Sequence, residues 1–320
     1  MHESVNYGIR VRSNVALPWA DGQHARDAPV TELAVQMGGE PPAFARSHAD
    51  CASPWSHGAP RVDGLGVHEL RDTGALLLRY PDGVEFVLSR DGRSAWSRWP
   101  SALTAAYAVD YLIAPVLGLV LRLQGTLALH ACAVRVGDRA VIVAGEAGRG
   151  KSTLSAALVA RGHDLLADDV AAVRLLDDCL MVEPGVPIVR LWPDSVRAAV
   201  PTDAPFVPLP DPWDKERLLL QRALGRRAPL AAVYLLTARE AAPHAPYFAA
   251  MSPRSALIAL AAESYAATLL DPRMREEQFR QLDALVKRVP VRLLTPHEDI
   301  GRLDALAQLV ERDCAGMPEP

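Results

Sequence analysis

The stretch that most constrains this chain runs from Ala140 to Val170. It opens with the apolar run AVIVA, which is long enough for a buried strand and too short for a helix. The next eight residues, GEAGRGKS at 145–152, fit G-x-x-x-x-G-K-[ST], the pattern of a phosphate-binding loop. Residues 152–161 then predict a helix capped by Gly162, and a second apolar strand follows it. The order of strand, loop, helix and strand predicts a nucleotide-binding α/β domain.

The loop and the first turn of its helix are expected to hold ATP. Glycines let backbone N–H groups turn toward one point, where the helix N-terminus adds partial positive charge. Lys151 can reach the β- and γ-phosphates, and the Ser152 hydroxyl can bind Mg²⁺. The chain has 34 Lys and Arg residues but lysine only at 151, 215 and 287, so a lysine at the motif position is not background. The expected nucleotide-binding residues are Gly145, Glu146, Ala147, Gly148, Arg149, Gly150, Lys151, Ser152 and Thr153.

Two carboxylates, Asp168 and Asp169, stand at the end of the second strand. Asp168 follows Ser152 by 16 residues, which is one helix plus one strand. A right-handed crossover places this strand in the same parallel sheet as the loop strand, so both end at the crevice where ligands bind. Adjacent side chains point to opposite faces of an extended chain. One carboxylate can therefore hold Mg²⁺ while the other takes a proton from an acceptor hydroxyl. The alternative is a turn with two solvated carboxylates.

A histidine also lies close to the loop in the predicted topology. Residues 127–134, LALHACAV, predict a strand beside the loop strand, with His130 on it. A single histidine on an apolar strand is usually a core residue. Beside a phosphate loop, it is also a candidate for assisting the acceptor hydroxyl.

The first part of the chain predicts a small, mostly β domain. Strands are expected at 5–11, 30–37, 67–71, 75–80 and 84–89, with a loop at 38–60. The apolar stretch 105–123 contains Asp110 and Pro115, so it predicts a buried, kinked helix rather than a membrane span. We therefore expect an N-terminal β domain with a linking helix at 1–124 and a phosphate-loop domain at 125–320.

The last part of the chain has further predicted elements. A β-hairpin is expected at 170–182, turning at Asp177-Asp178, and a proline-rich loop at 201–213. Strands are expected at 231–236 and 289–294. Helices are expected at 255–270, 273–288 and 300–311.

Charge and cysteine usage exclude several classes of function. The net charge is −4 and the arginines are scattered, which gives no sign of nucleic-acid binding. The four cysteines, at 51, 132, 179 and 314, have neither metal-site spacing nor a disulfide framework. Histidines 24, 48, 57 and 68 are not expected to form a metal site. The first residues lack the layout of a signal peptide, and no membrane partner is expected. These features predict a protein of the reducing cytoplasm, with self-association left open.

Three segments in combination resemble the catalytic domain of HPr kinase/phosphorylase. They are Leu129-His-Ala131, Gly145-Glu-Ala-Gly-Arg-Gly-Lys-Ser152 and Arg161-Gly-His-Asp-Leu-Leu-Ala-Asp-Asp169. Pro184-Gly185 and Arg190-Leu-Trp-Pro193, behind a small β domain, are more similar to the HPr-kinase-like proteins of biosynthetic clusters. Some of those phosphorylate a serine of a lasso-peptide precursor.

The resemblance implies a fold, an activity and roles for single residues. The fold is a phosphate-loop kinase domain with a mixed sheet and flanking helices. The activity is Mg-ATP-dependent phosphorylation of a serine in a peptide or protein. His130 and Asp168 would serve the acceptor hydroxyl, with Asp168 as the base. Asp169 would serve the metal together with Ser152.

Two other classes of function are weighed against this kinase. Small-molecule kinases also place carboxylates a helix and a strand after the loop, but the hairpin after Asp169 and the upstream His130 argue against them. A nucleotide-dependent switch or transport ATPase usually has a much later acidic strand. A pseudokinase would keep the loop as a structural element, and the intact Lys151, Ser152 and acidic pair argue against it.

Overall fold

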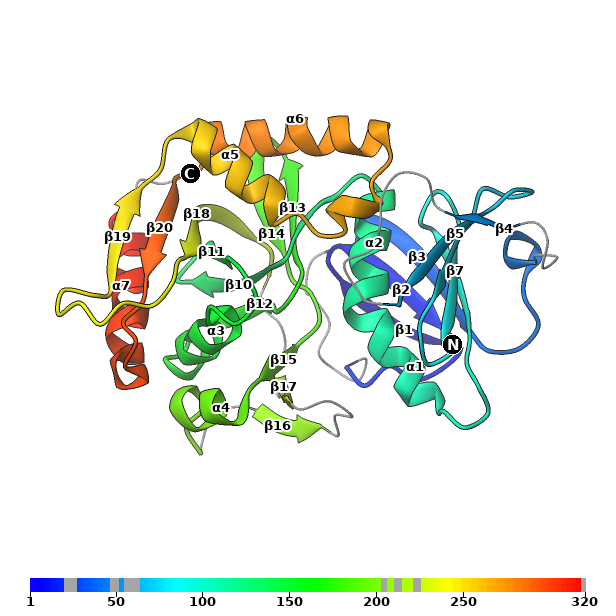
Figure 1. Ribbon diagram of the computed structural model, residues 1–320, viewed down its shortest axis with the longest axis horizontal. Coiled ribbons are helices and arrows are strands. Elements are labelled where there is room, and N and C mark those ends of the chain that lie inside the picture. Colours follow the sequence, from blue (N-terminus) through cyan, green and yellow to red (C-terminus); the bar gives the residue numbers. More distant parts are fainter. Residues whose placement is uncertain are drawn as a thin grey trace.

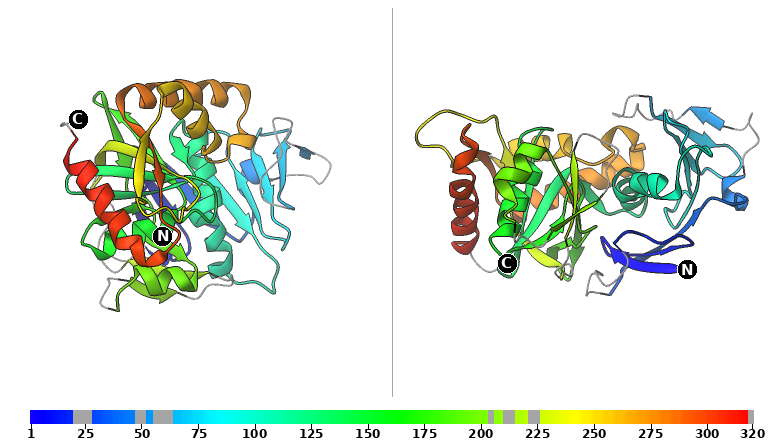
Figure 2. Two further views of the ribbon diagram at one scale, coloured as in Figure 1. Left: turned by 60° about the vertical axis from the view of Figure 1, so that its left-hand side comes forward. Right: turned by 90° about the horizontal axis from the view of Figure 1, so that it is seen from below.

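The computed structural model of this chain is a mixed α/β protein with two large sheets (Figure 1). It describes residues 1–19, 28–46, 52–54, 64–202, 206–209, 215–220 and 226–317. The N-terminal sheet lies at one end and the phosphate-loop sheet at the other, and helices α1 and α2 lie between them (Figures 1 and 2). The predicted α/β class, with a β-rich N-terminal region, is confirmed.

The N-terminal sheet has eight strands among the described residues, in the order β1-β2-β3-β8-β7-β6-β5-β4. Its strands are β1 His2–Asn6, β2 Ile9–Ser13, β3 Thr31–Met37, β4 Ala52–Pro54, β5 Gly66–Leu70, β6 Leu76–Arg79, β7 Glu85–Leu88 and β8 Ser94–Arg98. In β3 the residues Leu33, Val35 and Met37 are buried and alternate with more exposed neighbours, as expected of a strand with one face on the core. The strands predicted between 30 and 89 are present. The loop predicted at 38–60 contains the short helix η1 Ala43–Ala45 and β4, and its remaining residues lie partly outside the described ranges.

The single strand predicted at 5–11 is wrong, because the chain reverses there. β1 and β2 form an antiparallel hairpin whose turn is Tyr7-Gly8, with φ of 56° and 71°. Positive φ at both central residues is what a two-residue hairpin turn requires. Apolar and polar residues alternate across this turn, which made residues 5–11 look like one strand with Asn6 on its exposed face. Asn6 in β1 is in fact buried. Its side-chain amide donates to the Gly185 carbonyl at 2.7 Å, and its carboxamide oxygen accepts from the Trp19 indole at 2.9 Å.

The linking helix is buried and interrupted at Pro115, as predicted. α1 Ala105–Tyr111 passes through a π-turn, η2 Leu112–Val116, into α2 Leu117–Leu123. Proline removes a main-chain donor, and the wider turn accommodates it. Within the described ranges, none of the helices combines the length and apolar character that a bilayer crossing requires.

The second sheet has nine strands among the described residues. Seven run in the order β12-β10-β11-β18-β14-β13-β9, with β20 beside β18 and β19 beside β20. Their bounds are β9 Leu127–Leu129, β10 Ala131–Val136, β11 Arg139–Ala144, β12 Asp164–Ala167, β13 Ala171–Leu176, β14 Cys179–Glu183, β18 Ala228–Leu236, β19 Tyr247–Ala250 and β20 Val291–Thr295. The loop strand β11 is parallel to β18 and antiparallel to β10.

Two predictions about this sheet need correction. The strand expected at 127–134 is divided at His130, since β9 pairs with β13 while β10 pairs with β11 and β12. The strand before the acidic pair, β12, does share a sheet with β11, but the antiparallel β10 separates the two. The sheet is therefore mixed here rather than parallel. The sequence could not reveal this, because β10 is as apolar as a parallel strand.

The remaining elements surround the phosphate-loop sheet. A small sheet of order β15-β17-β16 is formed by Ile188–Leu191, Phe206–Leu209 and Glu216–Leu220. The helices are α3 Lys151–Ala160, α4 Pro193–Ala199, α5 Pro253–Ala262, η3 Ala267–Leu269, α6 Pro272–Arg288, η4 Ile300–Arg302 and α7 Leu303–Ala315. The helix predicted at 255–270 is shorter than expected. Neither α4 nor β19 was predicted, and β16 lies in what was expected to be loop.

The N-terminal hairpin packs against Pro184 and Gly185, which follow β14. The Tyr7 amide donates to the Pro184 carbonyl at 2.5 Å, and Tyr7 is 1% exposed. A Cβ at Gly185 would lie 2.2 Å from Cε1 of the Tyr7 ring, which is far inside contact distance. Position 185 therefore has to be glycine for the hairpin to dock.

We expect Gly185→Ala to destabilise the protein. The added methyl group overpacks the Tyr7 ring, and overpacking of this kind costs about 1–3 kcal/mol. The measurement is the free energy of unfolding in urea. Gly316→Ala is the control, because a Cβ there meets its nearest atom at an ordinary 3.5 Å. Equal stability of the two variants would contradict the packing described for Tyr7.

Candidate active site

The phosphate loop connects β11 to α3 at the carboxyl end of β11. Its three glycines, 145, 148 and 150, have φ of 133°, 81° and 106°. A Cβ on Gly145 would lie 2.8 Å from the main-chain oxygen of Leu236, at the end of β18. The loop therefore starts in close contact with the neighbouring parallel strand, and no larger residue fits there. Helix α3 begins directly at Lys151, so its N-terminal N–H groups face the loop.

Lys151 contacts the main chain of its own loop. Its ammonium donates to the carbonyls of Gly145 at 2.6 Å and Glu146 at 3.2 Å, and the residue is 8% exposed. A buried ammonium group needs such acceptors. Both contacts are local to the loop, so a phosphate group can take them over without other changes in the fold. The Glu146 carboxylate pairs with Arg149 and is mostly exposed.

Ser152 and Thr153 begin α3 with their side chains in different surroundings. The Ser152 hydroxyl lies 3.7 Å from the Cys132 sulfur and is close enough to Asp168 to lower the pKa of that carboxyl. The Thr153 hydroxyl instead donates to Ser195 of α4 at 3.0 Å. Of these two residues, Ser152 is therefore the one whose hydroxyl is near the acidic pair.

Asp168 is held from two sides. The Cys132 thiol donates to its Oδ1 at 2.8 Å, and the main-chain N–H of Arg190 donates to its Oδ2 at 3.0 Å. Burial raises the pKa of the Asp168 carboxyl, and these hydrogen bonds only partly offset it. Burial also raises the pKa of the Cys132 thiol, and the charge of Asp168 adds to the effect. Cys132 was not predicted as a site residue, and its only signal in the sequence is its position two residues after His130.

Asp169 turns the other way and pairs with His130. Its Oδ1 lies 3.1 Å from Nδ1 of His130, and its backbone has a positive φ of 70°. Burial pushes the pKa of Asp169 upward, but the hydrogen bond from His130 and the nearby charges of His130, Arg190 and Lys151 hold it below its usual value. The side chains of His130 and Asp169 are 38% and 37% exposed, so this pair is accessible to solvent.

Two tyrosines distant in sequence complete the surroundings of the acidic pair. Tyr7 comes from the N-terminal hairpin and Tyr265 from the segment after α5. Burial raises the pKa of both phenols, and the charge of Asp169 raises it further. Tyr7, Tyr265 and Arg190 were not predicted as site residues. Arg190 lies in the noted Arg-Leu-Trp-Pro segment, whereas the tyrosines had no signal because only the tertiary fold brings them here.

A cavity of about 650 Å³ opens beside the His130–Asp169 pair. The phosphate loop contributes Glu146 and Ala147 to its wall, and the segment 262–269 contributes another side. The N-terminal sheet and the linking helix supply the rest, so the cavity lies between the two halves of the molecule. Its volume is typical of small-ligand pockets, which span roughly 300–1,000 Å³.

The donor set near the loop fits Mg²⁺ better than a tightly caged metal. The described residues contain no cluster of three or more His, Cys, Asp or Glu side chains that would hold a metal ion. Mg²⁺ bound with nucleotide is usually held by one or two carboxylates plus substrate phosphates, with water completing its shell. The Ser152 hydroxyl and the Asp168 carboxylate are oxygen donors of this kind, and Ser152 lies beside Cys132, which donates to Asp168.

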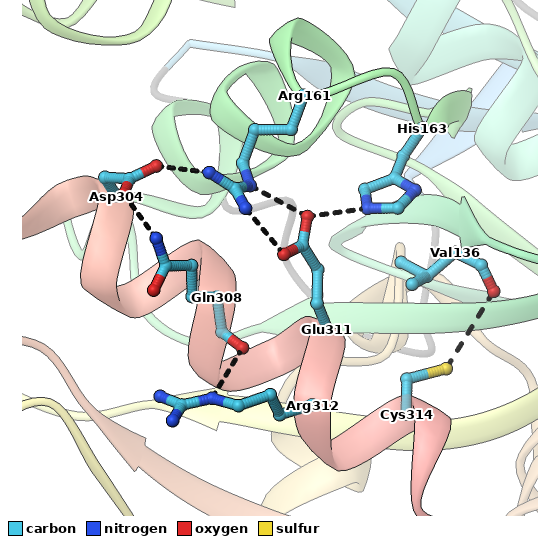
Figure 3. Close-up of polar contacts among 8 residues, drawn as sticks. All are labelled: Val136, Arg161, His163, Asp304, Gln308, Glu311, Arg312 and Cys314. Atoms are coloured by element: carbon cyan, nitrogen blue, oxygen red, sulfur yellow. Dashed lines mark hydrogen bonds and ion pairs between the residues drawn. The ribbon is translucent and has the colours of Figure 1, made fainter.

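Arg161 and His163, which also belong to the predicted motif, lie at the far end of α3 from the loop. Arg161 makes two hydrogen bonds to the Glu311 carboxylate, both at 2.8 Å, and His163 contacts the same carboxylate at 2.8 Å (Figure 3). Arg161 also pairs with Asp304 in the first turn of α7. These motif residues therefore fix α3 to α7 and do not touch the acidic pair.

With this geometry in view, residues 122–187 match the family described as the HPr serine kinase C-terminal domain. The match spans the strand break at His130, the phosphate loop and both aspartates. It confirms that this segment is HPr kinase-like, and it supports a phosphotransferase. A search of curated proteins gave no match.

Among solved structures, an Hpr(Ser) kinase/phosphatase from Coxiella burnetii is similar to this chain at 16% sequence identity. The alignment covers 58% of this chain and 89% of that one, with a TM-score of 0.32.

We expect Glu311→Gln to lower stability at neutral pH by about 1–2 kcal/mol, because a bidentate hydrogen bond between charged groups is lost and the pair is only partly exposed. The hydrogen bond from Arg161 lowers the pKa of Glu311. A lowered folded-state pKa gives stability that is present above the unfolded pKa and is lost as pH falls through the folded one. The difference between wild type and variant should therefore shrink on acidification below the usual glutamate range.

Denaturant unfolding measured between neutral and acid pH checks this expectation. Glu276→Gln is the matched control, since Glu276 lies on α6 with 74% of its side chain exposed. A stability difference for Glu311→Gln that does not change with pH would show that packing, and not the ion pair, links α3 to α7.

Proposed function

We propose that this protein is an ATP-dependent kinase that transfers the γ-phosphoryl group to a serine hydroxyl of a peptide or protein. The observation that carries the proposal is that two adjacent carboxylates beside the phosphate loop have different partners. Asp168 lies on the Ser152 side, and Asp169 lies with His130 on the cavity side. The family match at 122–187 supports phosphoryl transfer, and the resemblance noted in the sequence supports a serine acceptor, including a lasso-peptide precursor.

The nucleotide-binding part of the proposal uses residues 145–153. Lys151 exchanges its two loop carbonyls for phosphate oxygens, and the N–H groups at the start of α3 face the same point. Thr153 contributes through its main chain, because its hydroxyl is engaged by Ser195. The Glu146–Arg149 pair lies at the tip of the loop, where it can adjust to the bound nucleotide.

Mg²⁺ would be held by Ser152 and Asp168. When bound, the ion neutralises charge that develops on the phosphates during transfer. Cys132 and the Arg190 N–H fix the Asp168 carboxylate in place, and two such restraints reduce the freedom that a ligand has to lose on binding.

The acceptor part uses His130 and Asp169. The acceptor oxygen forms a bond to the γ-phosphorus as the bond between that phosphorus and the β,γ-bridging oxygen breaks, and ADP leaves. The hydroxyl proton passes to the His130–Asp169 pair, which is accessible from the cavity. This proposal exchanges the roles that the resemblance implied for the two aspartates, because Asp168 is the carboxylate near Ser152.

The wider setting follows the sequence expectations. We propose a cytoplasmic enzyme whose partner is its peptide or protein substrate. Self-association is compatible with this activity but is not required by it, since all of the residues assigned above come from one chain.

We expect Lys151→Ala to weaken ATP binding about tenfold or more. A charge-assisted contact is worth roughly 1.5–3 kcal/mol, and alanine removes it without replacing it. Calorimetric titration with ATP is the measurement. Lys287→Ala is a matched control, because this exposed lysine pairs only locally with Asp283 on α6. Equal ATP affinity in the two folded variants would exclude the loop as the nucleotide site.

We expect Asp168→Asn and Asp169→Asn to differ in their dependence on Mg²⁺. Asp168→Asn should require a much higher Mg²⁺ concentration, since an amide is a poor ligand for a hard cation. Asp169→Asn should bind Mg-ATP normally and turn over roughly 10²–10⁴-fold more slowly, the usual contribution of a general base.

Turnover titrated against Mg²⁺ separates the two variants, with Asp138→Asn in an exposed turn as the control. If Asp169→Asn shows the metal defect and Asp168→Asn the rate defect, the assignment that the resemblance implied is the right one. If the two variants are indistinguishable, the division of labour itself is wrong.

A further inference from the structure

The cavity beside His130 and Asp169 has a chemical character of its own. Leu65 and Leu78 come to it from the N-terminal sheet, and Pro115 and Leu119 come from the linking helix. These residues give the cavity an apolar wall. The predicted catalytic segment therefore supplies the reacting groups, while residues before 124 supply the surface that the rest of an acceptor would touch.

The charged side chains that line this cavity are mainly acidic. Glu146, Asp169 and Glu263 line it, and no lysine or arginine is among its described lining residues. A carboxylate on the acceptor would therefore meet three acidic side chains, and the cationic partners beside the wall, Arg149 and His130, are already paired with Glu146 and Asp169. An uncharged group meets no such penalty, and an apolar one gains from the leucine and proline wall.

One polar group in the wall lacks a partner. Tyr80 lines the cavity and is 3% exposed, and its hydroxyl has no hydrogen-bond partner among the described residues. Its ring is fixed against Tyr111, with ring centroids 4.0 Å apart. A buried hydroxyl without a partner is unfavourable, and a bound molecule with a polar atom at this depth would satisfy it.

We propose that this cavity is the acceptor-specificity site, and that it binds an uncharged, apolar residue next to the acceptor serine while rejecting acidic neighbours. The Tyr80 hydroxyl would bond to the main chain of the same segment, since an apolar side chain offers no polar atom. This inference rests on the proposed kinase function and extends it to the acceptor. It also gives the N-terminal region a role in choosing the substrate.

The test uses serine heptapeptides of one length as probes. Serine is fixed at the centre and the adjacent residue is Phe, Leu, Gly or Asp, with phosphate transfer from Mg-ATP measured as kcat/KM. Wild type should prefer Phe and Leu over Asp by at least tenfold. Leu65→Arg places a cation in the wall, and Leu65 is only partly buried, so the preference for Phe over Asp should fall by about tenfold or reverse. Leu175→Arg, at an exposed leucine outside the cavity, is the matched control and should keep the wild-type ratio.

Tyr80→Phe is the second variant, and it keeps the ring. Because the hydroxyl has no partner in the protein, the melting temperature should be unchanged or slightly higher. The KM for the Phe peptide should nevertheless rise about three- to tenfold, the scale of one lost hydrogen bond, with kcat nearly unchanged. A lower melting temperature with unchanged KM would mean that the hydroxyl serves the fold, which would overturn its assigned role.

The remaining outcomes separate this inference from the function on which it rests. A wild-type preference for Asp, or an unchanged ratio in a folded Leu65→Arg that binds ATP normally, overturns the specificity site. If no peptide is phosphorylated while free serine is, the cavity takes a small molecule and the inference fails, but the phosphotransferase proposal stands. If wild type does not bind ATP, the proposed function itself is wrong.

Discussion

One main-chain hydrogen bond, from Ala131 N–H to the Asp169 carbonyl at 3.2 Å, joins two breaks in neighbouring strands. The chain leaves β9 and enters β10 at His130, and it leaves β12 and enters β13 at the acidic pair. At both points the two halves pair with different strands. If β12 and β13 were one continuous strand, successive side chains would point to opposite faces of the sheet. One of the two aspartates would then face the helices. The paired breaks allow His130 and Asp169 to turn together toward the cavity while Asp168 stays with Cys132.

The breaks also explain why the positive φ of Asp169 is tolerated. A non-glycine residue with φ of 70° is uncommon, although Asp adopts it more readily than most residues. Here the carbonyl of Asp169 is fixed by Ala131, and its carboxylate is fixed by His130. Two independent contacts hold Asp169 in an unfavourable conformation, and such residues concentrate at functional sites.

The sequence predicted the parts of the site that depend on local pattern. The loop from Gly145 to Ser152, its helix and the acidic pair follow from glycine spacing and apolar runs, and the structure places them together. The break at His130 was not predictable, because LALHACAV reads as one continuous strand. The Tyr7-Gly8 reversal was missed for a similar reason, since apolar alternation continued through it. Cys132, Tyr7 and Tyr265 reach the acidic pair through pairings of strands and turns far apart in the sequence, and no local pattern encodes those.

The side of the site that faces the acceptor was the least predictable. Leu65 and Tyr80 belong to strand ends that the sequence assigned simply to a β domain. Their place in the cavity depends on how the N-terminal sheet packs on the linking helix. The hydrophobic core reflects this packing, because one cluster of buried residues runs from Ile9 and Phe86 through Leu117 to Val182 and Leu282.

The docking of Tyr7 on Gly185 has a consequence for how such a chain is made. Asn6 and Tyr7 are synthesised long before the segment at 184–185 that they contact. Until Gly185 is available, Asn6 and Tyr7 have no carbonyl to bond and no glycine surface to cover. The hairpin can form early, but its burial must wait for the centre of the chain. Docking of the hairpin beside the acidic pair therefore cannot precede synthesis of the segment at 184–185, and β18, β19 and β20 of the same sheet follow later still.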